Sequence, residues 1–169
     1  MRVGIIYATH FGYCELAAKE LKKYLETPST LISFDYKTHI NLEEFDALVL
    51  GGSVRMGLLD QDFIGWLNSH KEEITLKPHC FFLACGFEKD FDSYLEHSIS
   101  QELRDSALSI ECIGGRLDGK LKWYDKMLVK MMSKQLEKEG TALAAPTFEP
   151  LKVIAHKIDD SLQNRALEQ

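Results

Sequence analysis

The residues with the clearest chemical potential lie near the start of the chain, in the segment Thr9-His10-Phe11-Gly12-Tyr13-Cys14. An apolar run, Val3–Tyr7, precedes this segment and predicts a buried strand. A helix is predicted directly after it, over Glu15–Leu25. A strand, a glycine-containing loop and a helix N-terminus together favour anion binding, because loop amides point at the anion and the helix dipole stabilises negative charge. The alternative is an ordinary turn between strand and helix, where Thr and Gly are common.

Glycine also follows three later apolar runs, at Gly51-Gly52, at Gly86 and at Gly114-Gly115. In doubly wound sheets, ligands bind outside the carboxyl ends of the strands, and small residues there leave room for a flat ligand. The alternative is that these glycines only form turns. The six histidines show no metal-ligand spacing, and no catalytic triad or Walker lysine motif is readable. We therefore name no metal ligand and no catalytic side chain.

Strands and helices alternate along the chain, which indicates an α/β fold. Continuous apolar runs predict strands at 3–7, 31–34, 47–50, 80–84 and 109–113. Helical spacing predicts helices at 15–25, 61–73, 93–105, 117–139 and 151–162, with Asn41 capping one turn before Phe45. Strands that are apolar throughout, rather than alternating, predict a parallel sheet buried on both faces.

Composition restricts the class of protein. At 169 residues we expect one domain over 1–169. The net charge of -6 argues against nucleic-acid binding. No apolar run is long enough to span a bilayer, and no signal peptide is readable. The four cysteines form no CxxC pair, Cys80 and Cys112 read as small core residues, and a reducing cytoplasmic location fits them best.

Three stretches resemble the flavodoxin-like family, and more closely its menaquinone-dependent protoporphyrinogen oxidase group. The first is the loop of residues 9–14 described above. The second, Gly51-Gly-Ser-Val-Arg-Met-Gly57, is similar to that group's Gly-Ala-Ser-Ile-Arg-Tyr-Gly loop. The third, Leu121-Lys-Trp-Tyr-Asp-Lys-Met-Leu-Val-Lys-Met-Met132, is similar to its Arg-Trp-Tyr-Asp helix. The resemblance runs from the first strand to the last helix, and the second and third motifs are specific when they occur in this order.

The resemblance implies a three-layer flavodoxin-like sandwich with strand order 2-1-3-4-5, an FMN cofactor and redox chemistry that the cofactor supplies. Thr9 and the amides of His10, Phe11, Gly12, Tyr13 and Cys14 would hold the phosphate. One side of the flavin ring would be lined by Ser53, Val54, Arg55 and Met56, and the other by Cys85, Gly86, Phe87 and Phe91 or Tyr94. Arg55 would lie at the pyrimidine edge of the flavin or meet an acidic substrate, unless it is only a solvated loop cation.

Two features of this sequence differ from the pattern of the family that it resembles, and both bear on the function. Cys14 stands where flavodoxin loops usually carry Thr or Ser, and a thiol is the poorer hydrogen-bond donor. The segment Gly86–Ser109 is short and acidic where the oxidase group is longer and more basic, which counts against a membrane quinone and a porphyrin. The alternatives to an oxidoreductase of that group are therefore a soluble electron carrier and a binding domain that has lost the flavin.

Four lysines recur every four residues in the predicted helix Leu121–Lys134, at Lys122, Lys126, Lys130 and Lys134. One reading is a surface for an anionic membrane or an acidic partner. The other, which we favour, is a helix that packs on the domain with its lysines in water, because Leu and Met at this spacing are usually core residues. We expect at most weak peripheral membrane contact and a possible quinone or redox partner.

Overall fold

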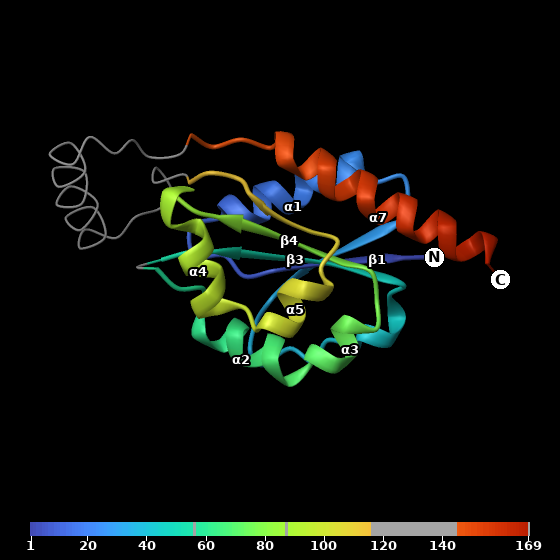
Figure 1. Cartoon of the computed structure of the whole chain (residues 1–169), viewed down its shortest axis with the longest axis horizontal. Coiled ribbons are helices and arrows are strands. Elements are labelled where there is room, and N and C mark those ends of the chain that lie inside the picture. The colour runs from blue at the N-terminus through green and yellow to red at the C-terminus, as the bar shows by residue number, and fades with distance from the viewer. Residues whose placement is uncertain (56, 87, 116–144, 169) are drawn as a thin grey trace, which may run out of the picture.

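Five parallel strands form one sheet at the centre of the protein, in the order β2-β1-β3-β4-β5 (Figure 1). The computed structural model describes residues 1–55, 57–86, 88–115 and 145–168. The strands are β1 (Val3–Tyr7), β2 (Ser29–Ser33), β3 (Ala47–Ser53), β4 (His79–Ala84) and β5 (Ser109–Cys112). The predicted α/β architecture and strand order are confirmed.

Helices cover both faces of the sheet (Figure 1). On one face, α1 (Tyr13–Tyr24) and α7 (Glu149–Leu167) pack against alternate strand residues such as Ile5 and Val49. On the other face, α2 (Gln61–Ser69), α3 (Lys71–Thr75), α4 (Phe91–Ser98) and α5 (Gln101–Ser106) cover the intervening residues, among them Ile6 and Leu50. The strand period of two thus divides the apolar runs of β1, β3 and β4 between two cores, which explains why these central strands are buried along almost their whole length. The edge strands β2 and β5 carry polar residues and are only partly buried.

Two predicted helices are each broken in two. The helix expected over 61–73 is interrupted at His70, which ends α2 and precedes α3. The His70 imidazole stacks on Trp66 at 4.8 Å between centroids, and its Nδ1 lies 2.9 Å from the Trp66 carbonyl oxygen. The helix expected over 93–105 is interrupted at Ile99, whose extended backbone (φ -125°, ψ 126°) separates α4 from α5.

The ends of the other helices and strands differ less from the predicted ones. The second strand begins at Ser29, two residues before the predicted start, and the last helix runs from Glu149 to Leu167, beyond the predicted 151–162. Asn41 caps the short 3-10 helix η1 (Leu42–Glu44) as expected, with its side chain accepting a hydrogen bond from the Glu43 amide at 3.2 Å. Cys80 is a core residue, whereas Cys112 is only half-buried. The predicted helix at 117–139 lies outside the described residues.

Within the described ranges, no helix combines the length and apolar character that crossing a bilayer requires.

Candidate functional site

The loop between β1 and α1 has an open N-terminal helix end. Gly12 precedes the helix with φ 81°, a left-handed conformation that favours glycine, and it provides no side-chain cap. Space beyond its Cα is empty, since a Cβ built there would meet nothing within 4 Å. The Thr9 hydroxyl accepts a hydrogen bond from the Gly12 amide at 3.0 Å, which stabilises the turn.

The donors of this loop suit an anion. Among the described residues, the amides of His10, Phe11 and Cys14 donate to no acceptor. Three free amides beside an uncapped helix N-terminus and a glycine with open space are the features that a phosphate requires. The loop geometry therefore fits a phosphate group on its backbone side.

The side chain of Cys14 differs from our expectation. We expected the thiol to face the phosphate, but it is fully buried, with hydrogen bonds to the Ser53 side chain and the Ala84 backbone. Burial raises the pKa of the Cys14 thiol to about 12, although both hydrogen bonds lower it. The second residue of α1 thus faces the sheet, and only its amide remains available to a ligand.

Tyr13 is also directed inward. Its hydroxyl donates to the carbonyl oxygen of Ile113 at 2.7 Å, and its ring stacks on Phe148 with centroids 5.6 Å apart. The side chain therefore links the start of α1 to the end of β5 and to the segment before α7. For Tyr13, as for Cys14, the predicted ligand contact is left to the backbone.

The second predicted segment forms a tight turn after β3. Arg55 and Leu58 exchange backbone hydrogen bonds, of 2.8 Å from the Arg55 amide and 3.2 Å from the Leu58 amide. Gly57 lies in this turn with φ 83°, and a Cβ there would lie 3.4 Å from the Tyr94 ring. The Val54 amide donates to the Ala84 carbonyl at 2.9 Å, which joins this turn to the end of β4. Arg55 is exposed, and Met56 lies outside the described residues.

The third predicted segment follows β4. Cys85 is buried and its amide donates to the Gly114 carbonyl at 2.9 Å, so its thiol does not line an open surface. Gly86 contacts Gly115 so closely that a Cβ on Gly115 would lie 2.8 Å from the Gly86 Cα. Phe91 is half-buried against the core beneath α4, and Phe87 lies outside the described residues.

Tyr94, on α4, joins the second and third segments. It lies against Gly57, and its hydroxyl is 3.4 Å from a carboxylate oxygen of Asp90. Burial, followed by the nearby charges of Asp90 and Cys85, raises the pKa of the phenol. Tyr94 is therefore a neutral aromatic side chain at physiological pH, suited to contact a flat ring.

One residue of this region was missed from the sequence. Asp60 caps α2 by accepting hydrogen bonds from the amides of Asp62 and Phe63, at 3.0 and 3.1 Å. Its second carboxylate oxygen lies 3.5 Å from Nε2 of His10 in the loop after β1. An Asp directly before a predicted helix is the N-cap signal that could have identified it.

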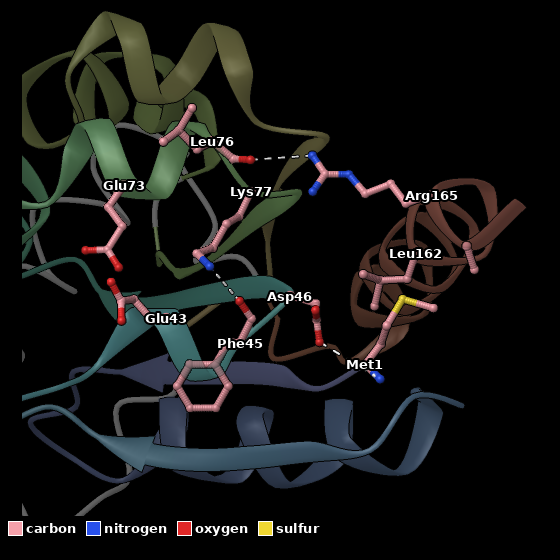
Figure 2. A pocket seen from close by; sticks show the side chains of 10 residues that line it. Met1, Glu43, Phe45, Asp46, Glu73, Leu76, Lys77, Leu162 and Arg165 are labelled. Atoms are coloured by element: carbon pink, nitrogen blue, oxygen red, sulfur yellow. Dashed lines mark hydrogen bonds and ion pairs between the residues drawn. The ribbon is translucent and has the colours of Figure 1, made fainter. Parts of the chain in front are cut away.

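A separate hollow of about 520 Å³ lies at the opposite edge of the sheet, near the amino ends of the strands (Figure 2). Lys77, just before β4, donates to the Phe45 carbonyl there at 2.7 Å, and Arg165 of α7 reaches the Leu76 carbonyl at 3.5 Å. None of the predicted site residues that the structure describes lines it. These described residues lie instead at the carboxyl edge of the sheet, in the segments after β1, β3 and β4 and in α4.

A family model described as a flavodoxin domain matches residues 4–142. The chain belongs to the flavodoxin domain family. This flavodoxin domain is similar to a WrbA-like flavodoxin from Agrobacterium tumefaciens, at 12% identity over 96% of this chain and 98% of that one, with a TM-score of 0.60. No curated protein matches the sequence.

Two further solved structures share the fold. A flavodoxin from the domain Archaea is 12% identical over 96% of this chain and 99% of that chain, with a TM-score of 0.53. Rubredoxin oxygen:oxidoreductase from Desulfovibrio gigas is 13% identical with a TM-score of 0.53, over 98% of this chain but 37% of its own length. The flavodoxin domain thus spans little more than a third of that protein.

Proposed function

We propose that the protein binds FMN at the carboxyl edge of the sheet and acts as a redox protein. The observation that carries the proposal is the flavodoxin-domain match over residues 4–142, on a chain whose loop after β1 has three free amides beside an uncapped helix. The amides of His10, Phe11 and Cys14 would hold the phosphate. Bound FMN would supply the electron-transfer chemistry.

The flavin ring would lie between the turn after β3 and the segment after β4. Ser53, Val54 and the backbone of Arg55 would contact one side of it. Gly86 and Tyr94 would contact the other, with Gly57 giving the closest backbone approach. The neutral phenol ring of Tyr94 suits this position, because aromatic stacking contributes about 0.5–1.5 kcal/mol beyond burial.

A flavin titration tests the cofactor. Purified apoprotein is titrated with FMN, FAD and riboflavin while quenching of flavin fluorescence is followed. We expect saturable binding that is tightest for FMN. A suitable control is Gly65→Ala in α2, where added volume meets nothing within 4 Å and binding should not change. Absence of saturable FMN binding into the high micromolar range would contradict the proposal.

For the activity, we propose an oxidoreductase related to the quinone-dependent protoporphyrinogen oxidases. The supporting observation is in the sequence, where the Ser53-x-Arg55-x-Gly57 loop precedes the Trp123-Tyr124-Asp125 motif in the order that this group shows. The test measures oxidation of protoporphyrinogen by FMN-loaded protein with a water-soluble quinone. Turnover above the rate with free FMN would support this activity.

The acidic segment between β4 and β5 favours a second candidate, a soluble electron carrier that docks a basic redox partner. A carrier would exchange electrons with a partner in a salt-sensitive way but would not turn over a porphyrinogen. The third candidate is a binding domain that has lost the flavin. Absence of FMN binding in the titration would favour this candidate.

We propose that the four regularly spaced lysines of the Leu121–Lys134 segment give at most weak membrane contact. These lysines lie outside the described residues. If they met anionic lipid, each lysine would contribute about 1 kcal/mol near the surface. Co-sedimentation with anionic vesicles at low and high salt tests this. A strong, salt-sensitive pellet would favour a membrane quinone as electron partner. The four cysteines, which form no CxxC pair, support a reducing, cytoplasmic location as part of the same proposal.

A further inference from the structure

An imidazole–carboxylate pair lies on the proposed phosphate loop. Nε2 of His10 is 3.5 Å from a carboxylate oxygen of Asp60, and the two side chains are 35% and 30% exposed. The other oxygen of Asp60 caps α2. One carboxylate therefore fixes both the start of α2 and the orientation of the loop histidine.

His10 is the one side chain of the loop, residues 9–14, that can carry a positive charge. The first lysine of α1, Lys19, is paired with Glu15 at 2.6 Å. Among the described residues, Asp60 is the charged group within ion-pair distance of His10, and the Phe11 ring is its aromatic neighbour. Because Nε2 faces Asp60, the other ring nitrogen, Nδ1, has no partner among the described residues and is available to an anion.

We propose that His10, held by Asp60, makes the site select phosphorylated flavin over riboflavin, and that this selection weakens as the pH rises. The inference rests on the proposed function, because it concerns the same site. A protonated imidazole donates from both nitrogens, so it can pair with Asp60 through Nε2 and with a phosphate through Nδ1. A neutral imidazole loses the charge that makes the second bond strong.

The direction of the pH effect follows from the charges. Histidine changes its charge between pH 5 and 8, whereas a phosphate monoester has its second ionisation near pH 6. Between about pH 6.5 and 8.5 the phosphate is mostly a dianion, while a histidine side chain in general becomes neutral as the pH rises, so FMN affinity should fall with rising pH. Riboflavin carries no phosphate, and its affinity should stay constant over the same range.

The experiment measures dissociation constants for FMN and riboflavin from pH 6.5 to 8.5 in wild type and in His10→Gln. In the variant we expect FMN binding at pH 6.5 to be weaker by roughly tenfold, without the pH dependence, because one charge-assisted bond is lost. Riboflavin binding should be unchanged. A matched control is His156→Gln, which removes a similar pair, 3.3 Å from Asp160, on the surface of α7.

A second variant tests the role of Asp60. Asp60→Asn keeps an N-cap that is as good as Asp while removing the charge beside His10. FMN binding should then weaken toward that of His10→Gln, because the imidazole has lost the carboxylate that orients it, while riboflavin binding stays unchanged. If His10→Gln keeps the wild-type FMN preference and pH dependence, the inference is wrong although FMN binding stands. If wild type binds neither flavin, the proposed function itself is wrong and the inference falls with it.

Discussion

The thiol of Cys14, in the first turn of α1, is hydrogen bonded to the side chain of Ser53, the last residue of β3. This contact joins the loop that would hold the phosphate to the turn that would hold the flavin ring. It also explains why a cysteine is tolerated at this position. The Cys14 side chain is a small part of the core, and the proposed phosphate site depends on the backbone of the loop.

The first prediction follows from this contact. Cys14→Ser should lower the free energy of unfolding by about 1–3 kcal/mol, because a more polar group is placed in a fully buried site with only partial hydrogen bonding. FMN affinity should change by less than about threefold, since the side chain does not face the phosphate, whereas one lost bond to a charged phosphate would exceed that. Urea unfolding and FMN titration measure the two quantities. A clear change in FMN affinity at unchanged stability would show that position 14 contacts the phosphate.

The second prediction concerns alkaline pH. The pKa of the Cys14 thiol is raised from 9.0 to about 12 by burial, so the unfolded chain loses this proton before the folded one does. Its contribution to stability is therefore intact below pH 9 and is lost as the pH rises toward 12, by at most roughly 1.4 kcal/mol per pH unit. Urea midpoints between pH 8 and 10.5 measure this loss. Cys14→Ser should show a shallower decline, while Cys80, whose pKa is also raised by burial, contributes equally to both proteins.

A third prediction compares two glycines. Gly57→Ala should lower the free energy of unfolding by about 1–2 kcal/mol, because φ 83° is a left-handed conformation that strains a Cβ. Gly65→Ala should raise it by about 0.5–1 kcal/mol, since Gly65 is in α2 with open space around it. Chemical denaturation of the three proteins measures both. Equal effects at the two positions would mean that the turn after β3 relaxes freely.

The fourth prediction concerns Asp159 of α7, which is 6% exposed. Its carboxylate accepts from the amides of Glu26 and Thr27, at 2.9 and 3.1 Å, and from the Thr27 hydroxyl at 2.7 Å. Asp159→Ala should lower the free energy of unfolding by about 3 kcal/mol, because three donors lose a charged acceptor. The neighbouring Asp160→Ala, on the exposed side, should change it by less than about 0.5 kcal/mol. A small change in the free energy of unfolding of Asp159→Ala would show that water replaces the carboxylate as the hydrogen-bond acceptor.

The fold could be predicted because the central strands β1, β3 and β4 contain continuous apolar runs and the helices between them have their own period. Ile5 and Ile6, adjacent in sequence, face the two cores on opposite sides of the sheet. The breaks at His70 and Ile99 could not be predicted in this way. Neither position carries Gly or Pro, and the chain turns there because α3 and α5 pack together, held also by the Lys71–Glu102 ion pair.

The candidate site was predictable in its backbone and less so in its side chains. Glycines at positions 12, 57, 86 and 115 mark the places where the chain turns or approaches closely, and this depends on local conformation. The directions of Tyr13, Cys14 and Cys85 depend on the rotation of α1 and on the packing of β4, which local sequence does not specify. The link between His10 and Asp60 joins two different loops, so no short motif could reveal it.

The close approach of Gly114 to Ala145 has an evolutionary consequence. A Cβ on Gly114 would lie 2.0 Å from the Ala145 carbonyl oxygen, and the Thr147 amide donates to Ile113 at 3.0 Å. The segment before α7 thus lies beside the end of β5, with Ala145 next to Gly114 and Thr147 next to Ile113. Loop-closure entropy grows slowly with length, so this junction accepts inserts of very different size at little energetic cost. Changes of length between Gly115 and Ala145 should therefore be tolerated in evolution without any change in the sheet.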